Sequence, residues 1–273
     1  MSATPHSDLP IGVFDSGVGG LTVLKAIRAA LPGENLVYLG DTARLPYGTK
    51  SPASIERYAT QAAARLHEQG IKLLVVACNT ASAVALNALR ASLAPLPVVG
   101  VVEPGASAAV AARPGGTHLV LATEATVRLG AYRDAVMARD ARAQVREHAC
   151  EMLVSLAEEG WSDGDIARAI VRRYLDEAGG PSPDTIILGC THFPLLKETI
   201  ADVAASGVTL VDSASTTADV VRQTLEQSGA QRQGGGPGSL RLLATDGATR
   251  FARVGGQFLG QDLSYRDVEI VDL

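Results

Sequence analysis

The sequence has few aromatic and charged residues and no long apolar run, and these absences exclude several classes of protein. Aromatic residues make up only 4% and charged residues only 19% of its 273 residues, and no apolar run is long enough to span a bilayer. Segment 1–10 is polar and contains no hydrophobic signal core, so we expect a cytoplasmic protein and no membrane partner. A net charge of -5 argues against a nucleic acid as the main partner.

Cysteine is also scarce, and its few positions constrain the chemistry. The chain has three cysteines, Cys78, Cys150 and Cys190, an odd number without a C-x-x-C pair. In a reducing compartment these residues are expected to be free thiols rather than a disulfide framework. Zinc binding by Cys78, Cys190 and His192 is conceivable, but ligands so scattered give a weak metal signal, and we expect no metal.

Apolar residues, in contrast, are plentiful at 47%, and their pattern predicts the fold class. Short runs rich in valine, isoleucine and leucine alternate with alanine-rich stretches that favour helix. Unbroken apolar strands between helices indicate parallel sheets covered on both faces, which is an α/β fold. The expected strands are Ile11–Asp15, Leu36–Gly40, Leu73–Ala77, Val98–Val102, Leu119–Ala122, Ile186–Gly189, Val208–Asp212, Leu242–Thr245 and Val268–Val271.

An internal similarity suggests two related halves. Segment 73–80 and segment 185–192 are each an apolar strand that ends in a small residue, a cysteine and two polar residues before a helix. Ligands of parallel α/β sheets bind outside the carboxyl ends of the strands, where both cysteines fall. Two such units facing each other would place Cys78 and Cys190 on opposite walls of a cleft.

Two loops carry further candidate groups. In Val13-Phe-Asp-Ser-Gly-Val-Gly-Gly-Leu-Thr22 an acid and a hydroxyl precede a glycine turn into a helix, whose free N–H groups could bind a carboxylate. The alternative is that Asp15 only caps that helix. Segment 40–51 is a strand-end loop, with a rigid Pro46 and a permissive Gly48, that can present backbone N–H groups and the Tyr47 hydroxyl to a ligand. The alternative is that it is an ordinary structural loop.

The cysteines themselves allow three chemistries. Cys150 fits a small buried residue, whereas Cys78 and Cys190 each stand before a helix start, a position that favours the thiolate. A metal site is one possibility, and a Cys–His hydrolase with a single nucleophile is another. Racemisation explains both cysteines, because inverting a stereocentre needs one group to remove a proton from one face and a second to deliver one to the other.

Several ordered motifs together resemble the glutamate racemase family. They are Phe14-Asp-Ser-Gly-Val-Gly-Gly-Leu21, Pro46-Tyr-Gly48, Ala77-Cys-Asn-Thr80, Gly100-Val-Val-Glu-Pro104 and Leu188-Gly-Cys-Thr-His-Phe-Pro194. The resemblance runs from about Ile11 to the C-terminus, where Thr245-Asp-Gly, Phe251 and Phe258-Leu-Gly260 also fit. It implies two similar α/β lobes, residues 1–98 plus 212–273 and residues 99–211, with the active site in the cleft between them.

The resemblance also implies roles for individual residues. Cys78 and Cys190 would be the acid/base groups, with Asp15 assisting near Cys78 and His192 near Cys190. Glu158 matches a family glutamate near the histidine. The substrate would be held by Ser16, Pro46, Tyr47, Gly48, Asn79, Thr80, Thr123, Thr126 and Thr191.

Two places depart from the family pattern. Leu129 stands where the family often has serine, and Cys150-Glu-Met-Leu-Val-Ser-Leu156 lacks both prolines of the family's Cys-Pro-x-Phe-Val-Pro-Leu run. Both departures bear on the local shape of the second lobe and therefore on the match of Glu158 to the family glutamate near the histidine.

The expected activity is the interconversion of L- and D-glutamate, which by resemblance supplies D-glutamate for peptidoglycan. No cofactor is expected, because the four lysines offer little for a pyridoxal phosphate site. Lys25, Lys72 and Lys197 fall away from the motif loops, and Lys50 alone is near one. A homodimer is expected from the family. The rivals are an aspartate racemase, a thiol hydrolase and a binding protein that keeps the cleft without turnover.

Overall fold

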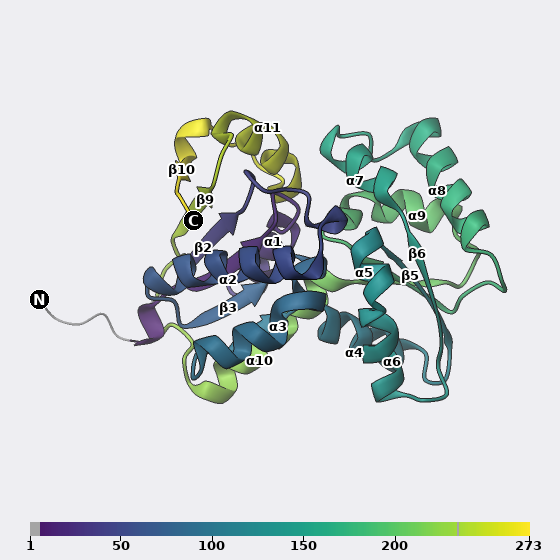
Figure 1. Ribbon diagram of the computed structural model, residues 1–273, viewed down its shortest axis with the longest axis horizontal. Coiled ribbons are helices and arrows are strands. Elements are labelled where there is room, and N and C mark those ends of the chain that lie inside the picture. Colours follow the sequence, from purple (N-terminus) through teal and green to yellow (C-terminus); the bar gives the residue numbers. More distant parts are fainter. Residues whose placement is uncertain (1–5, 234) are drawn as a thin grey trace, which may run out of the picture.

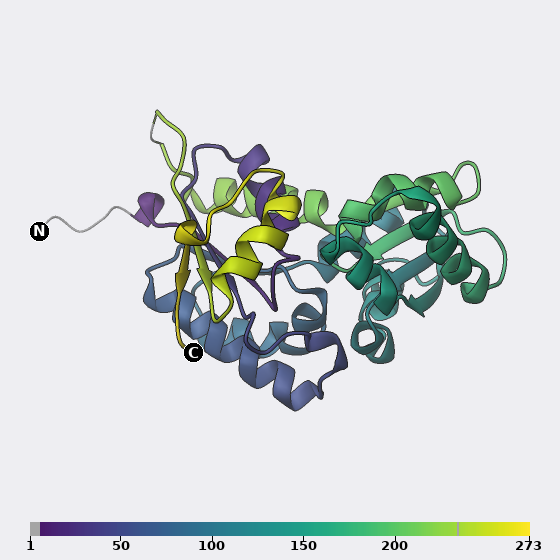
Figure 2. The same ribbon diagram turned by 90° about the horizontal axis from the view of Figure 1, so that it is seen from above.

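Two parallel sheets form the framework of the protein, each flanked by helices (Figures 1 and 2). The computed structural model describes residues 6–233 and 235–273. One sheet has six strands in the order β10-β9-β2-β1-β3-β4, and the other has four in the order β6-β5-β7-β8. Every strand pairing within the described ranges is parallel, which confirms the predicted α/β class.

The strands lie close to the positions expected from the apolar runs. They are β1 (Ile11–Asp15), β2 (Leu36–Gly40), β3 (Leu73–Val76), β4 (Val98–Gly100), β5 (Thr117–Ala122), β6 (Gln144–Ala149), β7 (Thr185–Gly189), β8 (Thr209–Asp212), β9 (Leu240–Ala244) and β10 (Val268–Ile270). The expected strand Val98–Val102 is too long, because Val101 is the N-cap of the next helix and Val102 is its first residue.

Helices follow almost every strand. They are α1 (Leu21–Ala30), α2 (Pro52–Glu68), α3 (Asn79–Leu93), α4 (Val102–Ala112), α5 (Glu124–Leu129), α6 (Ala131–Arg139), α7 (Glu151–Glu158), α8 (Gly164–Ala178), α9 (Lys197–Val203), α10 (Ser213–Ser228) and α11 (Ala248–Leu259). Short 3-10 turns are η1 (His6–Asp8), η2 (Tyr47–Thr49), η3 (Phe193–Leu196) and η4 (Tyr265–Asp267).

Successive residues of β1 show how the strands serve two helical layers. All five residues of β1 are buried, as expected for a central strand covered on both faces. Because neighbouring side chains point to opposite faces, Val13 packs in the core cluster that contains α1 and α10, and Phe14 packs in the cluster under α2 and α3. This is why the strand reads as a continuous apolar run instead of an alternating one.

The two sheets come from different parts of the chain. The six-stranded sheet takes its strands from 11–100 and 240–270, and the four-stranded sheet takes them from 117–212. Figure 1 shows the C-terminus returning to the first of these lobes. The lobe boundaries expected from sequence, after residues 98 and 211, stay a prediction; β4 extends to Gly100 within the first sheet and β8 to Asp212 within the second.

The lobes are held together by a common core. One apolar cluster joins Val13 and Leu24 of the first lobe to Leu121, Leu188 and Phe193 of the second. Burial of apolar surface contributes about 25 cal/mol per Å², so a cluster shared across the junction favours association of the lobes. Within the described ranges, no helix is both long and apolar enough to cross a membrane.

Candidate active site

The carboxyl ends of strands from both sheets meet at one small cavity. Asp15 is the last residue of β1, Cys78 follows β3 by two residues, Thr123 directly follows β5, and Cys190 directly follows β7. The cavity has a volume of about 50 Å³. Its walls are formed by Ser16, Pro46, Tyr47, Gly48, Cys78, Asn79, Thr80, Thr123, Glu151, Val154, Cys190, Thr191 and His192.

Most of the residues expected from sequence line this cavity directly. The three that do not are Asp15, Thr126 and Glu158, which lie behind its walls. Asp15 and Thr126 are buried, and Glu158 supports His192 from outside. The structure therefore brings Cys78 and Cys190 to one space from two different sheets.

Cys78 is the N-cap of α3, as the sequence suggests, but its surroundings do not favour the thiolate. Its sulfur accepts a hydrogen bond from the Ala81 backbone N–H (3.4 Å), and its thiol donates to Ser16 Oγ (3.5 Å). Burial, reinforced by the nearby Asp15 carboxylate, outweighs these contacts and raises the pKa of Cys78 to about 12. The expectation from the helix start alone is therefore wrong for this cysteine.

Asp15 lies under the same turn. Its side chain is buried and one carboxylate oxygen, Oδ2, accepts from the Gly17 backbone N–H (2.9 Å). Burial raises the pKa of this carboxyl, whereas His192 and the backbone N–H groups of the turn lower it. Within the described residues the other oxygen, Oδ1, has no hydrogen-bond partner. The carboxyl thus interacts electrostatically with Cys78 and with His192.

Cys190 has a different companion. Its Sγ lies 3.8 Å from His192 Nδ1, and His192 Nε2 lies 3.1 Å from Glu158 Oε1. Burial opposes a charged imidazole, but the contacts with Cys190 and Glu158 outweigh it and raise the pKa of His192 to about 10. These contacts favour the protonated ring at neutral pH, placed between the Cys190 sulfur and the Glu158 carboxylate.

Tyr47 lines the cavity but does not offer it a hydroxyl. The hydroxyl donates to Asp41 Oδ2 (2.5 Å), which corrects our expectation of a contact with the ligand. Asp41 is fully buried and also accepts from Arg44 Nε (2.8 Å) and from Thr245 Oγ1 (3.0 Å). This aspartate, which sequence reasoning passed over, fixes the loop of Pro46 and Gly48 against the end of β9.

Hydroxyl and amide contacts close the cleft from the other side. Thr80 of the first lobe lies within hydrogen-bond distance of Thr123 (3.0 Å) and Thr126 (3.2 Å) of the second. The Tyr132 hydroxyl on α6 donates to Asn79 Oδ1 (2.7 Å) on α3. These contacts order the helix start that follows Cys78.

The glycine turn after Asp15 faces the second lobe. A Cβ atom at Gly19 would lie 2.3 Å from Thr191 Oγ1 and 2.5 Å from His192 Nδ1. Thr22 Oγ1 donates to the backbone oxygen of Thr191 (2.9 Å). The turn therefore allows close approach of the two lobes.

Helix α7 supplies two cavity residues that sequence reasoning missed. Glu151 and Val154 lie one turn apart on α7 and both face the cavity. The signal was present in the run after Cys150, where Val154 retains the family's valine and Glu151 replaces a proline. Glu151 is the first residue of α7, and its carboxylate accepts from the Glu124 backbone N–H (2.5 Å).

The departures from the family pattern leave the second lobe regular. Without the prolines, α7 still runs to Glu158, which reaches His192. Leu129 ends α5, and Gly130 then takes a φ of +63°, a conformation that suits glycine. Cys150 is fully buried as the N-cap of α7, and burial raises its pKa.

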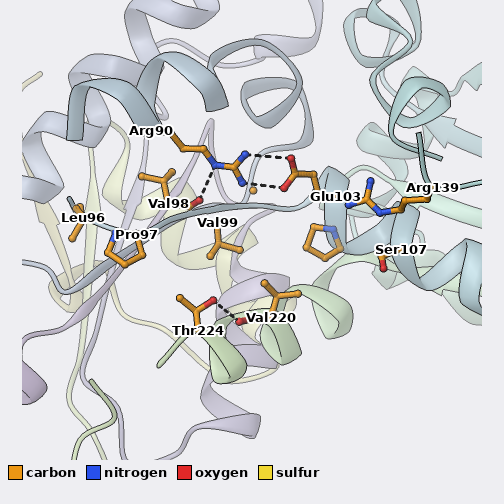
Figure 3. A pocket seen from close by; sticks show the side chains of 12 residues that line it. Arg90, Leu96, Pro97, Val98, Val99, Glu103, Ser107, Arg139, Val220 and Thr224 are labelled. Atoms are coloured by element: carbon orange, nitrogen blue, oxygen red, sulfur yellow. Dashed lines mark hydrogen bonds and ion pairs between the residues drawn. The ribbon is translucent and has the colours of Figure 1, made fainter. Parts of the chain in front are cut away.

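A larger cavity, of about 540 Å³, lies where α3, α4, α6 and α10 meet (Figure 3). Its walls contain no cysteine among the described residues. Arg90 and Glu103 form a two-pronged ion pair there (3.0 and 3.2 Å), which lowers the pKa of Glu103. Across the described ranges, no three or more histidine, cysteine, aspartate or glutamate residues are grouped so that they could hold a metal ion.

Comparisons with known proteins agree with this geometry. A family model described as Asp/Glu/Hydantoin racemase matches residues 11–221. The glutamate racemase of Geobacter metallireducens is 48% identical over 253 residues, which are 93% of this chain and 93% of that protein. The crystal structure of glutamate racemase from Francisella tularensis in complex with D-glutamate has a TM-score of 0.90 at 35% identity, covering 97% of this chain and 98% of that one.

A more distant structure separates the fold from the family. The aspartate racemase of Picrophilus torridus has a TM-score of 0.58 at 17% identity, covering 81% of this chain and 94% of that one, and shares the fold alone. The match to the racemase family model and the much higher identity to glutamate racemases place the chain more narrowly. The chain belongs to the Asp/Glu/Hydantoin racemase family and, within it, to the glutamate racemases, which are isomerases.

Proposed function

We propose that the protein interconverts L- and D-glutamate by a two-base mechanism in which Cys78 and Cys190 act on opposite faces of the α-carbon. The observation that carries the proposal is that the two thiols, positioned by different sheets, line one cavity. One thiolate takes the α-proton and becomes a thiol, while the opposite thiol gives its proton to the resulting carbanion and becomes a thiolate. The next turnover can run in the reverse direction without any other group gaining or losing a proton.

The electrostatics of the cavity suit such a weak carbon acid. A thiol whose pKa is raised to about 12, as for Cys78, gives a strong base once it is deprotonated. Exclusion of water from a small cavity preserves that basicity. On the other wall the His192 imidazolium stands beside Cys190 and can stabilise negative charge there.

Substrate binding is assigned to the polar groups around the cysteines. We infer that Ser16, Thr80, Thr123 and Thr191 offer hydroxyls and that Tyr47, Gly48 and Asn79 offer backbone N–H groups. Pro46 shapes the loop that carries Tyr47 and Gly48, and Thr126 supports Thr80. The relative from Francisella tularensis was solved with D-glutamate, which supports glutamate as the ligand. The cavity of about 50 Å³ is small for an amino acid, so the lobes are expected to separate for entry and close for reaction.

The test is exchange and inversion at the α-carbon of glutamate in heavy water, with purified, dialysed protein and no added cofactor. We expect each enantiomer to be converted into the other with uptake of one solvent deuterium. If aspartate is racemised and glutamate is inert, the substrate assignment is wrong. If neither is exchanged but glutamate still binds in calorimetry, the protein is a binding protein and the proposal fails.

The biological role follows from that reaction. D-Glutamate made by this activity would supply peptidoglycan synthesis in the cytoplasm, and a homodimer is part of the same proposal. Depletion of the protein should be rescued by external D-glutamate if the role is correct. Sedimentation of the purified chain measures the oligomeric state directly.

A further inference from the structure

An arginine from the first lobe holds the carboxylate that supports His192. Arg250 lies on α11, and its Nη2 is 2.6 Å from Glu158 Oε2. Glu158 is the last residue of α7, in the other lobe, and its second oxygen, Oε1, is the one that faces His192 Nε2. The carboxylate therefore has one oxygen directed to each lobe.

Helix α11 contacts the same histidine at a second point. The ring of Phe258 meets the His192 ring edge to face, with centroids 5.0 Å apart and planes at 80°. Gly160, just after α7, lies against Gln257, since a Cβ atom there would be 3.2 Å from Gln257 Oε1. Arg250 and Phe258 thus approach the pair of Glu158 and His192 from one helix, so that the ring and its carboxylate are fixed together.

The surroundings of Glu158 show what Arg250 prevents. The glutamate also borders a cavity of about 210 Å³, into which an unrestrained carboxylate could turn. Asp246 borders the same cavity and offers no attraction for a second carboxylate, and Arg250 is the cation on its described walls. The Arg250 side chain is 56% exposed, so its ion pair contributes little to folding stability.

We propose that Arg250 is a positioning residue for the racemase reaction: it fixes the Glu158 carboxylate from the first lobe and thereby holds His192 beside Cys190. The inference rests on the proposed function and extends it, because it links one acid/base wall to the closed arrangement of the lobes. The ion pair between Arg250 and Glu158 can form only while α11 of the first lobe is in contact with α7 of the second. By contrast, the described hydrogen-bond partners of Cys78, Ser16 and Ala81, both belong to its own lobe.

The first test compares Arg250→Met with Arg253→Met. Arg253 is an exposed arginine on the same helix, and its side chain has no hydrogen bond or ion pair within the described residues. We expect Arg250→Met to lower kcat by about tenfold, in the range produced by small misplacement of a catalytic group, with KM changed less than about twofold. Arg253→Met should match the parent, and Arg250→Lys should recover part of the loss because it restores the charge without the planar fork.

Isotope effects distinguish positioning from a general loss of structure. The two enantiomers have equal free energy, so kcat/KM must fall equally in both directions. Slower proton transfer at Cys190 should instead increase the α-deuterium isotope effect for the enantiomer that Cys190 deprotonates, and decrease it for the other. Equal isotope effects in Arg250→Met and the parent would overturn the proposal.

The second test does not depend on turnover. Iodoacetamide alkylation, resolved by peptide mass spectrometry, reports separately on Cys78 and Cys190. Since an imidazolium beside a sulfur favours the thiolate, Arg250→Met should slow the alkylation of Cys190 at least about threefold relative to that of Cys78. An equal change at both cysteines, or none, contradicts the positioning role. If the parent does not racemise glutamate but the alkylation is selective, the proposed function fails and the link from Arg250 to Cys190 stands.

Discussion

The two cysteine walls of the cavity are alike in backbone and different in electrostatics. Each cysteine follows a parallel strand and precedes a helical turn. At Cys78, burial and the nearby buried acid Asp15 raise the pKa of the thiol, and the Ser16 hydroxyl offsets this only in part. Cys190 instead stands beside the His192 ring, which Glu158 supports from the other side. A duplicated strand-end geometry therefore supplies two positions for proton transfer, and neighbouring side chains decide which charge each position prefers.

The strongest test of this comparison removes one wall at a time. We expect Cys78→Ala and Cys190→Ala each to lower racemisation by about 10³-fold or more, within the range for loss of an acid/base group. Each variant should still exchange the α-proton of one enantiomer, and the two variants should differ in which. Proton NMR in heavy water measures both quantities.

Cys150→Ala is the matched control for these variants. Cys150 is fully buried and borders no part of the cavity, so its loss should leave racemisation within a few-fold of the parent. Exchange of both enantiomers by a single-cysteine variant would show that the walls are not separate.

The second prediction removes the charged group next to each cysteine. His192→Asn and Asp15→Asn should each reduce kcat by about 100-fold, because each removes a charge next to one proton-transfer site. The isotope effect should rise for opposite enantiomers in the two variants, as measured with α-deuterated L- and D-glutamate. A rise for the same enantiomer in both would show that Asp15 and His192 act on one wall.

The third prediction concerns pH. Folding raises the pKa of His192 from 6.5 to about 10, so its protonation stabilises the folded state fully below about pH 6.5, and this contribution is lost as the pH rises towards 10. The loss should amount to a few kcal/mol at most. Denaturant unfolding at pH 7 and pH 10 should show a smaller pH dependence for His192→Asn than for the parent. An identical dependence would contradict the paired imidazolium.

The smallest expected effect concerns the wall supplied by α7. Glu151 places a carboxylate at the edge of the cavity, which opposes the approach of an anionic amino acid. Glu151→Gln should lower KM for glutamate by about two- to threefold with little change in kcat, and more at low ionic strength. Glu159→Gln, an exposed neighbour beyond α7, is the control and should leave KM unchanged.

Much of this arrangement could be predicted from sequence because it depends on local patterns. Apolar runs place the strands, and the polar residues directly after them, such as Asp15, Thr123 and Cys190, must then lie at the carboxyl edge of a parallel sheet. Repetition of the strand-cysteine pattern indicated two facing units. The site residues therefore follow from position along the chain more than from any single motif.

What could not be predicted depends on contacts between distant segments. The helix start at Cys78 suggested a favoured thiolate, but burial and Asp15 act in the opposite direction. The Tyr47 hydroxyl is taken by Asp41, and Arg250 meets Glu158 from 92 positions away. Such pairings depend on how the lobes pack, and neither charge nor spacing in the sequence identifies them.

Gly19 determines how closely the lobes can approach. Since a single added carbon there would overlap both Thr191 and His192, the first lobe has no spare clearance above the second cysteine loop. A larger residue at position 19 would push the two lobes apart, and only a smaller side chain at position 191 or 192 would relieve the overlap. Which residues are tolerated at position 19 therefore depends on the residues at positions 191 and 192. A larger side chain on one side of this contact requires a smaller one on the other.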